Sequence, residues 1–466
     1  MTTETILPAP AVVPEETAAA PAWPPVLRVG FRIAFVYFGC FVLVSRNGNL
    51  FNLLPVVGGW INNALQWLPD HASLWVGKHV FHLAGLAAQW QPTGSGDTAL
   101  NWIENGLYAV LALVGSLVWT LAAALRGNRR TEYATLHAWL RFFLRLTCGG
   151  FMLIYGCAKV FPMQMAPISI AILNEPVGNM SPMTMLWAMI GLHPLYEIVC
   201  GFAEVIGGVL LLFRRTALLG ALVSAFVVAN VVLYNFFFDV PVKIFAANLL
   251  LACLYLAVPD LRALFAFFWL HRPATASAPW IPATSHRWSR ITLRVAEVVV
   301  SFALLLAIPG MMGMNWFHGA AERHAQSPLM GAWHLDAAHP ASGAFLTPEG
   351  AAITDFYVDT TGRAFRRDND GALWRTGLYI QADKHLITVF AYGAGPTKYS
   401  WQMSDTNHLI LTTVPPDPPK ANGKSAAKPA PAFTPVTISF TRTPTMAHPF
   451  LLERGFHFVN EWGLER

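Results

Sequence analysis

Long apolar runs occupy the first two thirds of this chain and limit what it can fold into. A helix that crosses a membrane needs about 20 consecutive apolar residues. Charged residues make up only 12% of the chain, against the roughly 25% that is usual in soluble proteins. The sequence therefore predicts seven transmembrane helices, at about 27–46, 104–125, 138–160, 193–213, 216–238, 241–258 and 293–312.

The loops between these runs differ in charge, and the difference predicts their orientation. The loop at 126–145 holds five arginines and one glutamate, and the loop at 271–294 holds four arginines and no acidic residue. Short loops rich in Lys and Arg stay on the cytoplasmic side of a membrane. We therefore expect a bacterial inner-membrane protein with a cytoplasmic N-terminus and a periplasmic C-terminal part. The net charge of +5 lies in these short loops, so the orientation explains it and no nucleic-acid partner is expected. The expected partner of the helices is the lipid bilayer.

Residues 329–441 change character, because short alternating runs of apolar and polar residues replace the long apolar ones. Seven or eight such runs, separated by Gly, Asp and Asn, are typical of strands joined by hairpins. They predict a small antiparallel β-barrel or sandwich that resembles a lipocalin. Such a barrel is either filled by its own side chains or holds one small apolar ligand.

These patterns predict an α-helical polytopic membrane bundle followed by an antiparallel β-domain. Segments rich in Ala and Pro, at the N-terminus and at 414–435, predict disorder. The expected parts are a disordered cytoplasmic tail at 1–26, N-terminal helices with a periplasmic amphipathic loop at 27–137, a four-helix core at 138–270, a cytoplasmic loop with the last transmembrane helix at 271–314, and the periplasmic β-domain at 315–466.

The predicted helices at 138–160 and 193–213 contain several ionisable residues, and three of them, Lys159, Glu197 and Glu204, are candidates for a site. Charged residues inside a span usually face the bundle interior and indicate a functional site. Lys159 and Glu197 would lie at a similar depth, so they form either an ion pair that joins the two helices or part of a site. Lys159 could instead extend to the membrane surface. Glu204 would lie about 10 Å deeper, as either a proton-linked functional group or a satisfied buried polar group.

The stretch "LYNFFFDVPVKIFAANLL" (Leu233–Leu250) places charge between two apolar runs. Asp239 and Pro241 are residue types that begin helices, so they predict a capped turn between two spans. Capping gives no role to Lys243, which would lie at the level of Lys159. The alternative is a polar pocket in the outer half of the bundle, suited to an anionic or quinone-like ligand. Its candidate residues are Lys159, Glu197, Glu204, Asp239 and Lys243.

A second polar loop, "GSGDT", precedes the predicted helix at 104–125. Asp97 or Thr98 can cap that helix, whereas Gly94 and Gly96 can instead leave backbone N–H groups open to an anion. The sequence carries no recognised catalytic or nucleotide-binding motif. Its five cysteines lie inside apolar runs, and the eight histidines of the C-terminal part lack metal-ligand spacing. The sequence therefore identifies no catalytic residue and predicts no metal site.

Residues 138–270 contain three stretches that resemble the DoxX-like family of four-helix membrane proteins. They are "RLTCGGFMLIYGCAKVFP", "LYEIVCGFAEVIGGVLLLFRRTALLGAL" and "LAVPDLRAL". The resemblance implies association with a membrane redox complex, with a quinone as the candidate cofactor and a redox protein as the candidate partner. The chain differs from a minimal family member by its three additional helices and its β-domain.

Three functions remain open from the sequence. The first is a membrane subunit that binds a quinone or a redox partner through the polar pocket. If such a protein is an enzyme, it is a subunit of a membrane oxidoreductase. The second function is a non-catalytic scaffold that presents the β-domain to partners. The third is a small-molecule or proton-coupled transporter that uses Glu204.

Overall fold

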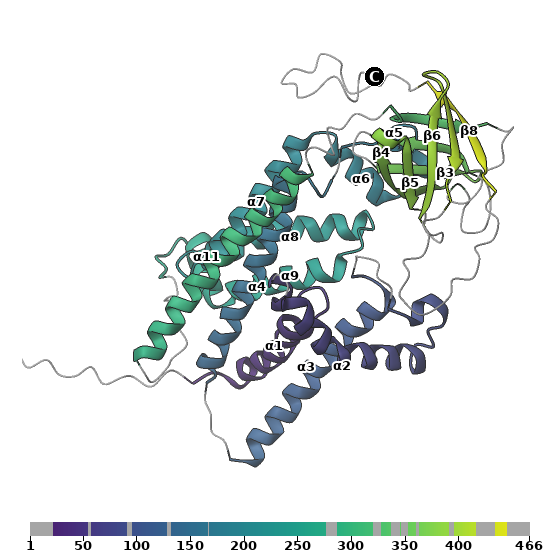
Figure 1. The fold of residues 1–466 in the computed structure, drawn as a ribbon. Coiled ribbons are helices and arrows are strands. Elements are labelled where there is room, and N and C mark those ends of the chain that lie inside the picture. The colour runs from purple at the N-terminus through teal and green to yellow at the C-terminus, as the bar shows by residue number, and fades with distance from the viewer. Residues whose placement is uncertain are drawn as a thin grey trace, which may run out of the picture. The chain divides into compact units, whose positions relative to one another are not determined.

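The computed structural model describes most of the chain (Figure 1). Gly94, and most of the predicted disordered segments at 1–26 and 414–435, lie outside the described residues. The described residues are 22–54, 57–90, 96–127, 132–165, 167–275, 287–319, 328–336, 345, 353–359, 363–390, 396–415 and 434–444.

Seven helices of the described chain are long and apolar enough to cross a membrane, and they make this a multi-pass membrane protein. Such helices suit a bilayer because they satisfy their own backbone hydrogen bonds and present apolar side chains to lipid. The seven predicted spans are confirmed, with shifted ends. They are α1 (Pro25–Val44), α3 (Ala99–Leu125), α4 (Ala134–Val160), α7 (Pro194–Leu212), α8 (Ala217–Phe237), α9 (Lys243–Ala257) continued by η4 (Val258–Asp260) and α10 (Leu261–Phe268), and α11 (Arg287–His318).

Two segments that were expected to be loops contain helices of their own. Between α1 and α3, Pro69 and Asp70 interrupt the apolar pattern, so the sequence predicted only an amphipathic loop where a 23-residue helix forms. Between α4 and α7, Ser169 and Ser181 cap two shorter helices. These elements are η1 (Leu50–Leu53), α2 (Val57–His79), η2 (Gly85–Ala88), α5 (Ile170–Leu173), η3 (Val177–Asn179) and α6 (Pro182–Gly191).

The chain forms two compact units. The first comprises Met1–Phe151, Gly207–Val232 and Pro241–Phe302. The second comprises Met152–Ile206, Leu233–Val240 and Ala303–Arg466, and it includes the β-domain. Helices α4, α7, α8 and α11 contribute residues to both units.

The C-terminal strands form a closed antiparallel barrel. Each strand pairs with its neighbours in sequence, and β1 also pairs with β8, so the sheet has no unpaired edge. The predicted antiparallel β-domain is confirmed as a barrel. Its strands are β1 (Gly331–Leu335), β2 (Ile353–Val358), β3 (Arg363–Asp368), β4 (Leu373–Gln381), β5 (Leu386–Phe390), β6 (Thr397–Met403), β7 (His408–Thr413) and β8 (Thr437–Thr443), with η6 (Ala382–Lys384) between β4 and β5.

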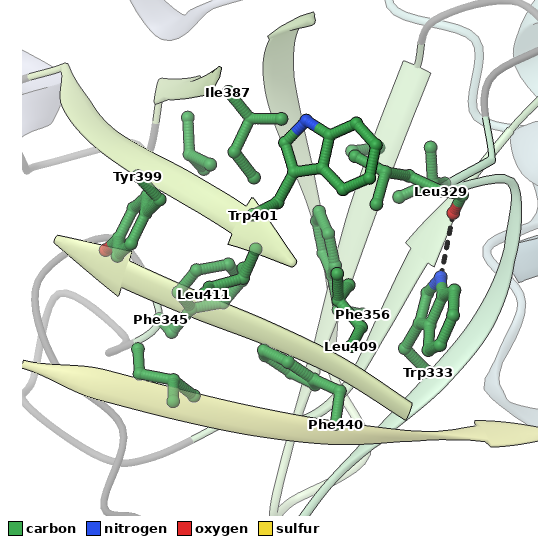
Figure 2. Close-up of a cluster of buried hydrophobic side chains, with 14 of the residues drawn as sticks. Leu329, Trp333, Phe345, Phe356, Ile387, Tyr399, Trp401, Leu409, Leu411 and Phe440 are labelled. Carbon is green, nitrogen blue, oxygen red and sulfur yellow. Dashed lines mark hydrogen bonds between the residues drawn. The ribbon is translucent and has the colours of Figure 1, made fainter. Parts of the chain in front are cut away.

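Large apolar side chains fill the barrel interior, because alternate residues of each strand point inward. Figure 2 shows the rings of Phe345, Phe356 and Phe440 gathered inside, with the Phe345 centroid 5.2 Å from that of Phe356 and 5.3 Å from that of Phe440. The indole of Trp333 is fully buried and donates a hydrogen bond of 2.8 Å to the carbonyl of Leu329. Of the two forms that the sequence left open, the described side chains match the filled barrel.

Helix α5 packs on the outside of the barrel. Ala171 lies in a small apolar cluster with side chains of β1 and β2. The guanidinium of Arg367, on β3, contacts the Glu175 carboxylate at 2.6 Å and donates to the Asn174 carbonyl at 3.1 Å. The segment that follows α4 is therefore joined to the barrel by both apolar packing and an ion pair.

Candidate functional site

Helices α4 and α7 approach each other closely at two glycines. A Cβ atom added to Gly156 would lie 2.8 Å from a backbone nitrogen of α7, and one added to Gly201 would lie 2.7 Å from the Gly156 carbonyl oxygen. Small residues permit such close contact between membrane helices. Lys159 lies about one turn after Gly156, and Glu197 and Glu204 lie about one turn before and after Gly201, so the contact gathers the three charged residues.

Lys159 and Glu204 form a buried ion pair. The Lys159 Nζ atom lies 2.9 Å from both carboxylate oxygens of Glu204, and each residue is only 4% exposed. The ring of Tyr155 adds a further contact, with its centroid 6.0 Å from the ammonium. Glu204 is therefore hydrogen-bonded and its charge is compensated.

Glu197 has a different environment. Its residue exposure is 0%, and its Oε1 accepts a hydrogen bond of 3.0 Å from the backbone N–H of Met165. Its Oε2 has no hydrogen-bond partner among the described residues. The ion pair expected between Lys159 and Glu197 is thus replaced by Lys159–Glu204. The reason is that the turn after α4 places a backbone N–H against Glu197, which a count of helix turns does not reveal.

A groove lies next to this turn within the second unit. Its volume is about 390 Å³, within the range of small-molecule sites. Gln164, adjacent to Met165, lines the groove, and its amide oxygen is buried without a hydrogen-bond partner among the described residues. Residues of α6, β3 and β4 form the other walls.

The groove combines apolar walls with a few polar groups. Met163, Ile168 and Trp187 supply apolar surface, while Ser169 and Arg375 supply hydrogen-bond donors. The Ser169 oxygen already accepts the Ile172 N–H at 3.2 Å, so its own O–H remains available as a donor. The groove therefore offers a ligand both apolar surface and hydrogen-bond donors.

Lys243 is positioned by a residue that lies far away in the sequence. The Asp97 carboxylate accepts backbone hydrogen bonds from Lys243 (2.6 Å) and Ile244 (3.0 Å), and the Lys243 ammonium lies 3.9 Å from it. The prediction that Asp239 occupies the N-cap position of this helix is wrong. Asp239 has a left-handed backbone (φ 52°) and an exposed side chain, and the N-cap position of α9 belongs to Val242.

Two other residues of the GSGDT loop, Gly96 and Thr98, are also held by contacts within the protein. The Thr98 hydroxyl accepts the Asn101 N–H and forms a capping box, which confirms one of the two candidates for the α3 cap. The Gly96 N–H donates to the Pro241 carbonyl at 3.1 Å. Gly94 lies outside the described residues. The Gly96 N–H is therefore hydrogen-bonded to the turn before α9 and is not free to bind an anion.

Contacts among the described residues thus bring together three of the five predicted pocket residues, Lys159, Glu197 and Glu204. Lys243 contacts Asp97 in the first unit, and Asp239 lies at an exposed turn of the second. The five predicted residues therefore include one charge cluster and two residues, Asp239 and Lys243, that lie where α8 ends and α9 begins.

A second buried charge cluster, in the first unit, was not foreseen. One oxygen of Glu297, on α11, binds Arg145 of α4, and the other binds Arg214. The available signals were a lone acidic residue in the apolar run at 293–312 and the position of Arg145 on α4. Elsewhere in this unit, the buried carboxylate of Glu104 accepts a hydrogen bond from Tyr108. Neither acidic residue was singled out because the sequence does not tell which helices meet.

The described residues contain no group of three or more His, Cys, Asp or Glu side chains that could hold a metal ion. The five cysteines are free. The groups available for chemistry near Lys159 are therefore hydrogen-bonding side chains and a buried carboxylate, with a groove beside them.

Comparison with known proteins places part of the chain in a family. No family model matches the sequence, and no solved structure matches it. The uncharacterized protein YwoB of Bacillus subtilis (strain 168) is 32% identical over 140 residues, which are 30% of this chain and 86% of YwoB. The chain belongs to the YwoB family. Because the match to YwoB is shorter than the seven spans and the barrel together, YwoB accounts for only part of this chain.

Proposed function

We propose that this protein is a quinone- or redox-partner-associated subunit of a bacterial inner-membrane system, with its ligand site in the groove beside Lys159, Glu197 and Glu204. The observation that carries the proposal is the state of Glu197. This carboxylate is fully buried, yet one oxygen has no hydrogen-bond partner among the described residues. Buried polar groups are normally satisfied, so an exception asks for a functional explanation.

The chemistry of a quinone matches these groups. Its ring is flat and apolar, and its two carbonyl oxygens accept hydrogen bonds and take up protons on reduction. The walls formed by Met163 and Trp187 suit the ring, and Ser169 and Arg375 can donate to the carbonyls. Glu197 is joined to the groove through the Gln164–Met165 backbone, so it can hold a proton close to the bound ring. Electrons would come from a separate redox protein in the membrane.

The proposed orientation places the N-terminus in the cytoplasm and the barrel in the periplasm. The arginine-rich loops at 126–145 and 271–294 support this orientation. Reporter fusions after Gly127 and after Gly319 should report opposite sides of the membrane. Reporter activity on the same side for both fusions would contradict the orientation.

The quinone proposal is tested by purifying the full-length protein from its native membrane and measuring bound quinone by mass spectrometry. Wild-type protein should retain about one quinone per chain through washing with detergent. Trp187→Ala should lose most of it, since Trp187 lines the groove. Met185→Ala is the matched control, because Met185 lies on the same helix, is 41% exposed and is not a groove residue. If wild type and both variants all carry the same trace amount of quinone, the proposal is rejected.

The filled barrel supports a second function, a scaffold that presents the β-domain to other proteins. Its described interior is packed with side chains, and Arg367 and Glu175 hold it to the segment after α4. The same purification separates the two functions. A stoichiometric protein partner without bound quinone would favour the scaffold.

A further inference from the structure

Helix α2 exposes large apolar side chains, while the positions that it buries are small or polar. Its buried positions are Gly58, Gln66, Ser73 and Gly77. Trp60 is 81% exposed, Trp67 62%, Leu68 68% and Trp75 60%. The other exposed residues of the helix include polar ones, namely Asn63, His71, Lys78 and His79. Residues at spacings of 7, 8 and 15 lie on one face of a helix, so the three tryptophans and Leu68 form a single stripe. A stripe of this kind is expected where lipid rather than water surrounds the helix.

The contacts of α2 place it at the ends of two membrane spans. The Gln66 side-chain amide donates to the carbonyl of Val44, the last residue of α1. A Cβ atom added to Gly77 would meet side-chain atoms of Leu100 and Ile103, in the first turns of α3, at 3.2 and 3.5 Å. Helix α2 is therefore held where α1 ends and α3 begins, which is the level of the membrane surface.

Its composition does not suit a transmembrane path. Asp70 lies in the middle of the helix next to Pro69, and its carboxylate binds Arg46, just beyond the end of α1. The guanidinium of Arg46 also lies 4.2 Å from the centre of the Trp90 ring. Asp70 and Arg46 are thus polar groups expected to remain in the hydrated zone while the tryptophan stripe faces the apolar zone. Tryptophan itself favours this boundary.

We propose that α2 lies flat in the lipid head-group interface, with Trp60, Trp67, Leu68 and Trp75 inserted toward the acyl chains. The occupant of this exposed face is lipid. Helix α3, whose first turns contact α2, also exposes apolar side chains such as Leu113 and Leu117 along its membrane span, which supports lipid as the neighbour of this part of the chain. Val80, Phe81 and Leu86, which follow α2, are also more than half exposed.

Hydroxyl-radical footprinting of the full-length protein in phospholipid nanodiscs tests this proposal. Water generates the radicals, so side chains surrounded by lipid are oxidised slowly. Oxidation of Trp60, Trp67 and Trp75 should be several-fold slower in nanodiscs than in a denatured reference. Phe226, which is 82% exposed within the span α8, is the lipid-facing control, and Tyr379, which is 57% exposed on the barrel, is the water-facing control.

The outcomes separate lipid from other occupants. Protection of the three tryptophans comparable to that of Phe226, while Tyr379 remains reactive, supports the interfacial helix. Oxidation as fast as that of Tyr379 overturns it. Protection that appears only after a membrane extract is added also overturns it, because the occupant would then be a protein. None of these results depends on the quinone proposal.

Discussion

The ammonium of Lys159 on α4 lies 2.9 Å from both carboxylate oxygens of Glu204 on α7. Both residues are buried, so either charge would be costly to leave without its partner. The contact depends on Gly156 and Gly201, which let the two helix backbones meet. Charge compensation and helix packing are therefore coupled at this point of the bundle.

Removing either member of this pair should destabilise the protein. Lys159→Met leaves the Glu204 carboxylate buried without a counter-ion, and Glu204→Gln leaves the ammonium in the same position. Each change should lower the free energy of unfolding by about 3–5 kcal/mol, the usual cost of an unpaired buried charge. The double variant should recover much of the loss. Thermal unfolding of the four proteins in detergent measures the coupling.

A second cycle, with Glu197→Gln in place of Glu204→Gln, is the matched control. The introduced glutamine side chain would keep an oxygen that can accept the Met165 N–H, and Glu197 lies outside ion-pair distance of Lys159. The coupling energy in this cycle should be clearly smaller. Equal coupling in both cycles, or additive effects of Lys159→Met and Glu204→Gln, would contradict the observed pairing.

The sequence identified these three residues but not their pairing. The sequence alone shows an ionisable residue inside an apolar run, and helical spacing correctly put Glu197 and Glu204 on one face. Which carboxylate meets Lys159 depends on where Gly156 crosses Gly201 and on the turn that brings the Met165 N–H to Glu197. Both are tertiary facts that residue spacing does not contain.

A methyl group at the helix crossing should separate α4 from α7. In Gly201→Ala, the new Cβ would lie 2.7 Å from the Gly156 carbonyl oxygen, and a backbone atom cannot move aside easily. We expect a loss of about 1–3 kcal/mol, as for other overpacked sites. Gly106→Ala on α3 is the control, since nothing lies within 4 Å of its added Cβ. It should be neutral or stabilising by up to about 1 kcal/mol. Similar unfolding temperatures for the two variants would argue against the close contact.

The cap of α9 should depend on Asp97 and not on Asp239. Asp97→Ala removes the acceptor for the Lys243 and Ile244 N–H groups and should cost about 1–2 kcal/mol. Asp239→Gly should cost much less, because glycine tolerates the left-handed backbone found at this position while the change removes the carboxylate that would act as a cap. Thermal unfolding of both variants in detergent provides the comparison. A loss from Asp239→Gly as large as that from Asp97→Ala would return the capping role to Asp239.

The barrel was easier to predict than the charge clusters. Strand alternation is a local pattern, and the eight antiparallel pairings join neighbours in sequence, apart from the closing pair of β1 and β8. Glu297 and Asp97, by contrast, act on residues 152 and 146 positions away. The residues that neighbour Glu297 and Asp97 in the sequence do not indicate which distant residues these two carboxylates bind.

The barrel should fold without the membrane helices, since it is closed and has its own apolar core. Residues 325–466 expressed alone should give a β-type circular dichroism spectrum. Phe356→Ala should lower their stability by about 3–5 kcal/mol, because the ring is fully buried. Tyr379→Ala, at an exposed position, should change it by no more than about 0.5 kcal/mol. A helical spectrum, or equal losses from both variants, would refute an independent barrel.

The turn between β6 and β7 should respond to acid through Asp405. Its carboxylate accepts backbone hydrogen bonds from Asn407 (2.7 Å) and His408 (2.9 Å), and it also contacts the His408 ring. The Asn407 N–H and the His408 side chain hold the pKa of Asp405 below its ordinary value of 3.8. A lowered pKa in the folded state means that the charged carboxylate stabilises the turn above the unfolded pKa, and that this contribution disappears as the pH falls through the folded pKa. Wild type should therefore exceed Asp405→Ala in unfolding temperature near neutral pH, and the difference should shrink in acid. A carboxyl-carbon NMR titration gives the pKa directly, and a midpoint above the ordinary value would disprove this account of the turn.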